Sequence, residues 1–359
     1  MTQTNTVSTK NYFSSTQAVL APMVRAAQVA GVKSLQEQLQ DIQRWLSADL
    51  VDLEASFLRA TAIDADCARK AADHLLRQPG KRVRPLCVLL AARAGGEAMS
   101  ETVKELAIAC ELVHSATLLH DDVLDEGRMR RGAEASRVLY GNSASVLGGD
   151  YLLIEALRRV RRTGENELLG RLMDVIDGMV RAEAAQLDRR GSFGADADAY
   201  HYIIYGKTAS IFEWGLSAGA RVAGLSQEAI DGFAGYGKAV GMAFQLVDDI
   251  LDLTADDAAL GKIGLADLRD GKLTWPLILA TEENPGLERE LDRLVKSADD
   301  EVDLSSVRAQ ILATDCIERS QIKARAYGQE ARDFLSVVPP SEAREALLTV
   351  IDAVIERGL

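Results

Sequence analysis

The chain has 359 residues and a formal net charge of −13, with 41 Lys and Arg against 54 Asp and Glu, which argues against a protein that binds nucleic acid through the phosphate backbone. With 47% hydrophobic residues it is long and apolar enough to bury a large core. Its four cysteines (Cys67, Cys87, Cys110 and Cys316) are far apart and lack a partnering histidine cluster, so neither a zinc site nor a disulfide framework is expected, and a reducing cytoplasm fits best.

Residues 1–35 are predicted to be a polar, mobile arm. The first twenty, MTQTNTVSTKNYFSSTQAVL, are rich in Thr, Ser, Asn and Gln and lack the basic start and apolar core of a signal peptide. Further along, charged residues interrupt every apolar stretch before it reaches the roughly 18–20 residues that span a bilayer. We therefore expect residues 36–359 to form one soluble, cytoplasmic domain.

Helices are expected to dominate this domain. Only seven prolines occur, and none lies between Pro85 and Pro276, so long helices can run there without a forced break. Apolar residues in this span recur at intervals of three and four, whereas alternating β-branched runs are scarce. The pattern predicts an all-α fold in which strands are unlikely.

The first candidate functional element is basic. The segment RQPGKRVRPL places Lys81, Arg82 and Arg84 directly after a Pro-Gly turn. Arginine binds phosphate oxygens with two parallel hydrogen bonds and lysine adds a compact positive charge, so a mixed cluster in an acidic protein indicates a phosphate site. A solvated basic loop is the alternative.

A long apolar helix follows, with Ser100 or Thr102 as its predicted N-cap. It ends in LLHDDVLD, which contains the three carboxylates of a first acidic motif, Asp121, Asp122 and Asp125. Residues four apart in a helix lie about 40° apart around its axis, so Asp121 and Asp125 face the same way. The motif can therefore present two carboxylates to one ligand.

Basic residues come directly after this motif. The stretch GRMRRG supplies Arg130 and Arg131. His114 lies seven residues before Asp121 and therefore on the same helix face, where its imidazole could donate to a phosphate. A lone histidine is more often structural, but this one shares its face with a candidate anion site.

A second helix, capped by Ser226, repeats the acidic pattern in LVDDILDL as Asp248, Asp249 and Asp252, the second acidic motif. One such pentapeptide is most simply a solvated helix end, but two copies that each follow an apolar helix indicate a functional cleft. Like charges this close at helix C-terminal ends are destabilising unless a cation lies between them. Carboxylates without His or Cys suit Mg²⁺, so two facing motifs could hold a diphosphate through several Mg²⁺ ions.

Two glycine-containing segments add further polar groups. YGKTAS contributes Lys207 and Thr208, and ALGKIGLADLRDGKLTWP contributes Lys262 and Lys272. The Gly-Lys-Thr string does not make a nucleotide P-loop, because His201 occupies the position where that loop requires its first glycine. Each segment alone is weak evidence of a phosphate site.

Together these motifs resemble the trans-isoprenyl diphosphate (polyprenyl) synthases. The match is carried by PGKRVRP, ELVHSATLLHDDVLDEGRMRRG, YGKTA and AFQLVDDILDL with GKIGLADLRDGKLT, and it runs from about residue 40 to the end. The resemblance implies an isoprenoid-synthase-type all-α helical bundle around a central apolar cavity, a homodimer and three Mg²⁺ ions per active site. It further implies head-to-tail condensation of isopentenyl diphosphate with an allylic substrate, farnesyl or geranylgeranyl diphosphate.

The resemblance also assigns roles by motif. It implies that the six aspartates of the two acidic motifs hold Mg²⁺ against the allylic diphosphate. The implied allylic-side contacts are Arg130, Lys207, Thr208, Gln245, Lys262 and Lys272. The implied isopentenyl-side contacts are Lys81, Arg82, Arg84, His114 and Arg131. Pro79 stands where many members have glycine, and Asp270 where many have glutamate, which affects the expected loop geometry more than the chemistry.

Small residues precede the first acidic motif on the helix face that would line a product tunnel: Thr117, Ala116, Val113, Cys110 and Ala109. Each helical turn adds about 5.4 Å of depth. Short-chain members typically carry a bulky aromatic residue four or five positions before the first aspartate, so this sequence resembles medium- and long-chain synthases and favours a C30–C50 product. Alternatively, the small residues only permit close helix packing, residues 152–157 set the floor, and the product is C20.

Two other functions compete. A class I terpene cyclase also ionises an allylic diphosphate with one acidic motif but needs no isopentenyl site, and a non-catalytic regulatory subunit can lose both motifs. The basic cluster and two intact motifs favour the condensing enzyme. A group of arginines (Arg158, Arg159, Arg161 and Arg162) allows at most peripheral contact with anionic lipid during product release, although a solvated helix end is the simpler interpretation.

Overall fold

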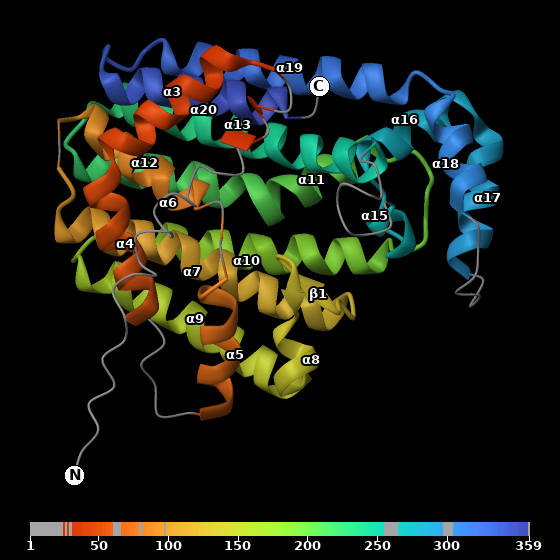
Figure 1. Cartoon of the computed structure of the whole chain (residues 1–359), viewed down its shortest axis with the longest axis horizontal. Helices are drawn as coiled ribbons and strands as arrows, with labels where there is room; N and C mark the ends of the chain where they lie inside the picture. Colours follow the sequence, from red (N-terminus) through yellow and green to blue (C-terminus); the bar gives the residue numbers. More distant parts are fainter. Residues whose placement is uncertain are drawn as a thin grey trace.

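The computed structural model describes residues 24–25, 27–28, 31–59, 66–78, 80, 82–96, 98–254, 265–296 and 304–357, and nearly all of them are helical (Figure 1). The all-α prediction is therefore confirmed. Most of the predicted N-terminal arm lies outside the described residues, as do Pro79, Lys81 and Lys262. Helix α3 begins at Lys33.

The elements follow one another along the chain. The N-terminal half contains α3 (Lys33–Trp45), α4 (Ser47–Arg59), α5 (Asp66–Leu76), α6 (Val83–Ala94), α7 (Glu101–Leu124), β1 (Met129–Arg130), β2 (Ala133–Glu134), α8 (Ser136–Tyr140), α9 (Asn142–Arg162) and α10 (Asn166–Asp188). The C-terminal half contains α11 (Ala197–Ile204), the π-helix η2 (Tyr205–Ala209), α12 (Ser210–Val222), α13 (Gln227–Thr254), α15 (Ala266–Arg269), α16 (Trp275–Glu283), α17 (Pro285–Lys296), α18 (Leu304–Leu312), α19 (Cys316–Leu335) and α20 (Glu342–Glu356).

Both long helices that carry the acidic motifs begin as predicted. The Ser100 hydroxyl accepts a hydrogen bond from the Val103 amide at 3.3 Å and caps α7. The Ser226 hydroxyl accepts one from the Ala229 amide at 3.3 Å at the start of α13. Each serine satisfies an amide that the first helical turn leaves without a partner.

A short β-hairpin departs from the expectation that strands are unlikely. Strands β1 and β2 pair antiparallel, with Met129 opposite Glu134 and Arg130 opposite Ala133. The two turn residues, Arg131 and Gly132, both have positive φ angles, 51° and 81°, as a tight two-residue hairpin requires. Because arginine rarely adopts this backbone conformation, the sequence Arg-Gly gave no clear hairpin signal.

The helices pack in layers around a central apolar core (Figure 1). In the middle of the molecule α12 packs against both α6 and α13, and α7 packs against α9. Helices α19 and α20 cover one side, and α5 with α8 flanks α9 on the other. A smaller apolar cluster, built around Phe193, Leu253 and Leu291, joins α16–α18 to the end of α13. The two acidic motifs thus end helices of the main core.

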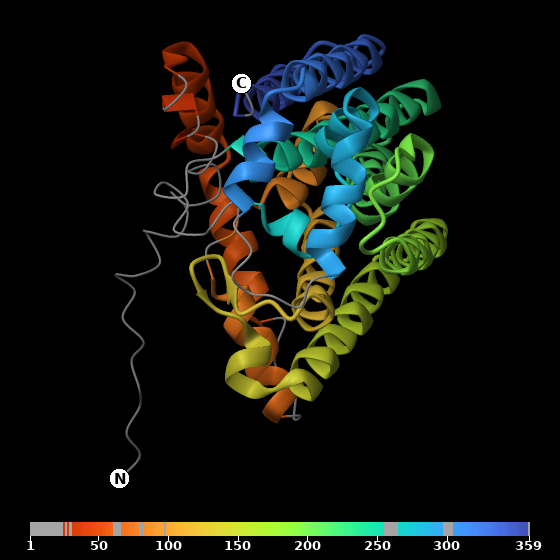
Figure 2. The same ribbon diagram turned by 90° about the vertical axis from the view of Figure 1, so that its right-hand side faces the viewer.

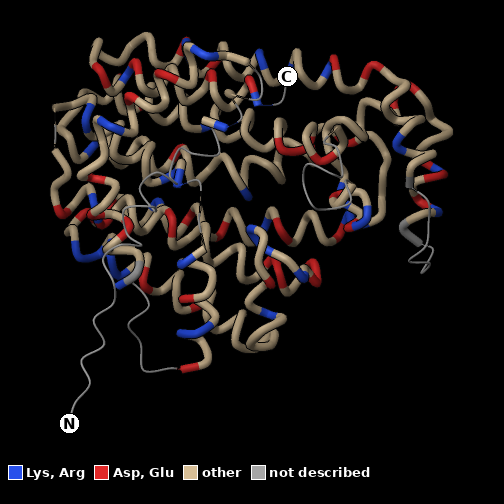
Figure 3. Tube along the Cα trace, viewed as in Figure 1, with Lys and Arg blue, Asp and Glu red and all other residues tan. Residues whose placement is uncertain are grey.

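Charged residues are spread along the part of the chain that the structure describes, with Lys and Arg interspersed among Asp and Glu (Figure 3). No helix within the described ranges is long and apolar enough to cross a membrane. Among the predicted cluster of four arginines, Arg159 pairs with Glu105 and Glu155, and Arg162 pairs with Glu155. Two of the four arginines therefore form ion pairs with other helix residues of the protein.

Close backbone contact holds α12 against α13. A Cβ atom at Gly237 would lie 2.6 Å from the Phe212 carbonyl oxygen and 2.8 Å from the Glu213 Cα atom. Real Cβ atoms do not approach backbone this closely, so glycine is required for the observed spacing. Gly178, in the middle of α10, has open space where a Cβ would lie.

We expect Gly237→Ala to lower the free energy of unfolding by about 1–3 kcal/mol, because the added methyl group forces α12 and α13 apart. Gly178→Ala is the matched control and should raise it by up to about 1 kcal/mol, since alanine is the better helix former. Chemical denaturation measures both. Equal stabilities of the two variants would contradict the close-packing argument.

Candidate active site

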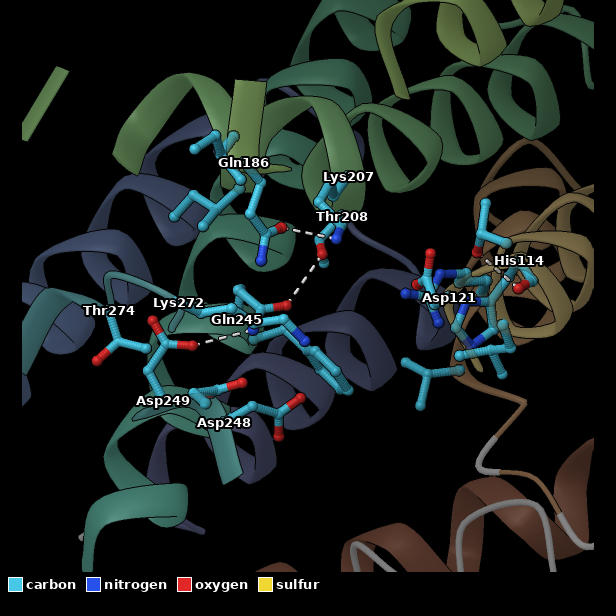
Figure 4. Close-up of a pocket in the computed structure, with 18 of the residues that line it drawn as sticks. His114, Asp121, Gln186, Lys207, Thr208, Gln245, Asp248, Asp249, Lys272 and Thr274 are labelled. Atoms are coloured by element: carbon cyan, nitrogen blue, oxygen red, sulfur yellow. Dashed lines mark hydrogen bonds between the residues drawn. The ribbon is translucent and has the colours of Figure 1, made fainter. Parts of the chain in front are cut away.

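A cavity of about 820 Å³ opens between the ends of α7, α11, η2 and α13 (Figure 4). Its lining draws on segments far apart in the sequence, from Arg25 to Thr274. The predicted site residues that line it are Arg82, Arg84, His114, Asp121, Arg130, Arg131, Lys207, Thr208, Gln245, Asp248, Asp249 and Lys272. The structure therefore brings together most of the residues that the motifs singled out.

The first acidic motif is held by two cations from later in the chain. Arg130 donates to the buried carboxylate of Asp122 from Nε at 2.8 Å and from Nη2 at 2.5 Å. Lys272 Nζ donates to Asp125 at 2.7 Å and to Asp270 at 3.0 Å. Lys272 therefore connects the first motif to the segment that follows the second one, across the mouth of the cavity.

The second acidic motif is held at all three carboxylates. Arg357, next to the end of the chain, pairs with Asp248 at 3.0 Å. Asp249 accepts hydrogen bonds from the Tyr200 hydroxyl at 2.7 Å and from the Gln245 amide at 3.0 Å. Asp252 lies outside the cavity lining and accepts from the two backbone amides that begin α15, those of Ala266 and Asp267, each at 3.1 Å.

The π-helix η2 turns two neighbouring polar residues toward different partners. Lys207 pairs with Glu183 and donates to Gln186 at 2.7 Å, both on α10. Thr208 donates to Gln245 on α13 at 3.0 Å. A π-helix inserts one extra residue per turn and often occurs at functional sites. It also confirms that the Gly-Lys-Thr string is not a nucleotide-binding loop.

A cationic region also lines the cavity. Arg84, Arg131 and His114 line it, and the His114 side chain lies near Asp121 in Figure 4. Arg84 is placed over the ring of Phe212, 4.8 Å from its centroid. The positive φ of Arg131 turns this side chain out of the hairpin, and its Nη1 atom is buried with no hydrogen-bond partner among the described residues.

Arg82 also lines the cavity, but its guanidinium is already occupied. It donates to Glu54 at 2.9 Å, to Glu111 at 2.7 Å and to the Leu76 carbonyl at 2.9 Å. A buried guanidinium with three such partners ties α4, α5 and α7 together. Its contacts position the loop around residue 80 instead of leaving donors free for a ligand.

Burial shifts the protonation equilibria of the acidic groups. It raises the pKa of Asp121 to about 6, although the charge of Lys207 opposes this shift. It raises the pKa of Asp267 to about 7, helped by the nearby charge of Asp252. Burial and the neighbouring Arg84 lower the pKa of His114 well below its usual range, so this imidazole is neutral at physiological pH.

The carboxylates fit a hard divalent cation such as Mg²⁺. The donor set is oxygen-only, and Asp122 Oδ2 is buried without a hydrogen-bond partner among the described residues. The described residues contain no preformed group of three or more metal-ligating side chains. Mg²⁺ does not require one, because it typically binds one or two carboxylates and takes its other ligands from water and phosphate.

Several residues of the site had no strong signal in the sequence. Glu183, Gln186, Tyr200 and Arg357 are distant from every motif, and they meet the motif residues only after folding. Asp267 was not among the predicted site residues either, although it lies within the segment GKIGLADLRDGK, where an acidic residue between two lysines is a signal that could have identified it.

Comparison with known proteins agrees with this geometry. The model of the family described as polyprenyl synthetase matches residues 65–311. The chain is 31% identical over 320 residues to the octaprenyl diphosphate synthase of Escherichia coli, an alignment that covers 89% of this chain and 99% of that protein. It is 34% identical over 313 residues to the heptaprenyl diphosphate synthase component 2 of Geobacillus stearothermophilus, covering 86% and 96%.

A solved structure is similar over nearly the whole fold. The polyprenyl synthase of Caulobacter crescentus, complexed with calcium and isoprenyl diphosphate, matches with a TM-score of 0.82 and 32% identity. The match covers 88% of this chain and 96% of that one.

The raised pKa of Asp267 predicts a pH-dependent stability. The carboxyl has a pKa of about 7 in the folded chain, against about 3.9 when unfolded, so its contribution to stability is present at low pH and is lost as the pH rises through 7. Without added metal, we expect the melting temperature to fall between pH 5 and pH 8 by a few degrees more in the unmodified chain than in Asp267→Asn. Parallel melting curves across this range would contradict the assignment.

Proposed function

Because the chain belongs to the polyprenyl synthetase family and is a prenyltransferase, we propose that it condenses isopentenyl diphosphate head-to-tail with an allylic diphosphate, in a reaction that requires Mg²⁺. The allylic substrate is farnesyl or geranylgeranyl diphosphate, and the product is a trans-polyprenyl diphosphate of C30–C50. Residues 36–359 act as the single catalytic domain.

One observation carries this proposal: two acidic motifs and a separate cationic region share one cavity. The acidic motifs supply oxygen ligands for metal ions that neutralise one diphosphate. The cationic region around Arg84 and Arg131 supplies donors for another anion without any acidic motif of its own. Two diphosphate substrates therefore have chemically distinct places in the same cavity.

On the allylic side, the six aspartates of the two acidic motifs are the proposed metal-binding set, and Asp121 and Asp248, which line the cavity, are its proposed direct ligands. Bound Mg²⁺ would stabilise the charge that develops on the departing diphosphate. Arg130, Lys207 and Lys272 each already contact carboxylates of the site or of α10, so they can turn to diphosphate oxygens with small side-chain movements. The remaining proposed allylic-side contacts are Thr208, Gln245 and, by its match to the family motif, Lys262.

On the isopentenyl side, Arg84 and Arg131 are proposed to grip the diphosphate, and the neutral His114 donates a single N–H. Lys81 joins this group by its match to the family motif. Arg82 acts indirectly, through its contacts with Glu54 and Glu111 that fix the adjoining loop. No Ser or Cys nucleophile is needed, because positioning and electrostatics supply the chemistry.

The length of the product depends on the apolar end of the cavity. Thr117 and Leu118 from α7 and Ile203 and Ile204 from α11 line the cavity, and α7 contributes no aromatic side chain to it. Farther down α7, Ala109 and its small neighbours lie in the packed core. The similarity to an octaprenyl diphosphate synthase supports a long product, whereas a closed core below Thr117 would favour C20.

A regulatory subunit is the second candidate, because one relative is named heptaprenyl diphosphate synthase component 2. A complete site in this chain favours activity without a partner. A class I terpene cyclase, the third candidate, would have no use for the Arg84 and Arg131 region.

The outer faces of α9 and α10 support a homodimer. Met173, Val180 and Leu187 recur every seven residues along α10 and are exposed by 55%, 63% and 38%. Leu147 and Ile154 repeat this spacing on α9, which packs against α10. Both helices lie at the margin of the molecule in Figure 2. An apolar stripe of this length on the surface indicates a protein interface, and a second copy of the chain fits it best.

The first experiment incubates the purified chain with Mg²⁺, farnesyl diphosphate and labelled isopentenyl diphosphate, and resolves the dephosphorylated products by length. We expect labelled products of six or more isoprene units. Products that stop at four units would support the closed-core alternative. No incorporation would favour the cyclase, and incorporation only with an added partner chain would favour the regulatory subunit.

In the same assay, Asp121→Ala and Asp248→Ala should each reduce turnover by roughly a thousandfold or more, because each removes a charge aimed at the departing diphosphate. Asp333→Ala, which changes an exposed aspartate on α19, is the matched control and should retain normal turnover. Near-normal turnover of both cavity variants would contradict the two-motif mechanism.

We expect Val180→Glu to convert a dimer into monomers, since it places a charge in the apolar stripe. Ile322→Glu, at a position 56% exposed on α19, should leave the dimer intact. Light scattering coupled to gel filtration gives the masses. A Val180→Glu variant that remains dimeric would show that the dimer interface lies elsewhere on the protein.

A further inference from the structure

A continuous set of hydrogen bonds crosses the second acidic motif. The Thr208 hydroxyl donates to Gln245 Oε1 at 3.0 Å, and Gln245 Nε2 donates to Asp249 Oδ1 at 3.0 Å (Figure 4). The Tyr200 hydroxyl donates to the other carboxylate oxygen, Oδ2, at 2.7 Å. Both oxygens of Asp249 therefore have a donor from the protein.

Both ends of this set come from one short stretch of chain. Tyr200 lies on α11, which continues directly into η2, where Thr208 lies. Gln245 and Asp249 are four residues apart on α13 and share a face. The segment from α11 to η2 thus grips the second motif at two points, once directly and once through Gln245.

Tyr200 is itself rigidly held. Its side chain is only 4% exposed, and its ring packs against Trp275 with centroids 5.4 Å apart. Trp275 in turn packs against His201 at 5.0 Å. A buried phenol between aromatic neighbours has little freedom to rotate, so its hydroxyl defines a fixed direction for Asp249.

We propose that Tyr200 is a positioning residue for the metal-binding function of the second acidic motif, and that it holds Asp249 so that Asp248 faces the diphosphate. This inference rests on the proposed function. It follows from a difference between the two residues, which both line the cavity: Asp249 is 4% exposed and both its oxygens accept hydrogen bonds from the protein, while the Asp248 side chain is 38% exposed and pairs with Arg357.

Removing the hydroxyl would leave Asp249 Oδ2 buried without a donor. A buried carboxylate oxygen without a partner costs free energy, which the side chain can reduce by rotating about its χ angles. Rotation would bring its carboxyl group toward Asp248 or Asp267 and change the geometry of the metal site. Metal binding should suffer while the helices stay in place, because phenylalanine preserves the ring contacts.

The test compares Tyr200→Phe with Tyr205→Phe in the full chain. Tyr205 lies five residues later in the same segment, and its hydroxyl donates to Glu213 at 3.0 Å, away from the cavity. Both variants lose one hydroxyl and keep the ring. Mg²⁺ is titrated at a fixed concentration of inorganic diphosphate while the melting temperature is followed. The midpoint is the Mg²⁺ concentration that gives half of the full rise in melting temperature, and it is obtained without any turnover.

We expect Tyr200→Phe to raise the Mg²⁺ midpoint roughly tenfold, as loss of a hydrogen bond to a charged group predicts, and Tyr205→Phe to leave it within about twofold of the unmodified chain. In turnover assays Tyr200→Phe should raise the Mg²⁺ concentration required for activity and leave the KM for isopentenyl diphosphate unchanged. Equal Mg²⁺ midpoints in all three proteins would overturn the inference about Tyr200 and leave the proposed function intact. If Mg²⁺ with diphosphate does not stabilise even the unmodified chain, the proposed function fails as well.

Discussion

The site depends on how the chain keeps many carboxylates together in one partly buried place. Two helices of the main core end in three aspartates each, where the helix dipole already disfavours negative charge. The folded chain compensates with its own cations: Arg130 on Asp122, Lys272 on Asp125 and Arg357 on Asp248. Protons contribute as well, since burial raises the pKa values of Asp121 and Asp267. A metal-bound diphosphate would take over this neutralising role, and it would free the same cations to bind the phosphate oxygens.

This arrangement explains why the cations come from such distant parts of the chain. Arg130 reaches back from the hairpin, Lys272 from the segment before α16, and Arg357 from the end of α20. Each ties a separate element to the acidic motifs, so the last helix and the hairpin are held by the same electrostatic centre. The close contact at Gly237 keeps α13 firmly against α12, which fixes the second motif relative to η2 and Lys207. Packing and charge therefore specify the same geometry.

The parts of this structure that the sequence predicted are local. Ser100 and Ser226 cap their helices because a serine before a helical stretch satisfies an exposed amide, and the DDxxD spacing places carboxylates on one face of any helix. The parts it could not predict are non-local or locally unfavourable. Tyr200 meets Asp249 across 49 positions, and nothing near Arg357 indicates a contact with Asp248. Arg131 adopts a left-handed conformation that only tertiary contacts can stabilise.

The difference between local and non-local features also applies to the helix face that was predicted to line a product tunnel. The small residues before Asp121 were expected to line an open tunnel, but only Thr117 of that set reaches the cavity, while Ala109, Ala116 and their neighbours are fully buried. Helices α7 and α9 are in van der Waals contact, since a Cβ at Gly148 would be 3.4 Å from the Leu119 side chain. A packed seam of small residues has no spare volume, so a growing apolar chain would have to separate helices or extend along the apolar residues that line the cavity from α7 and α11, Leu118 and Ile203. Small side chains on α7 remove the obstacle that an aromatic plug would pose, but because they are fully buried they add no depth to the cavity.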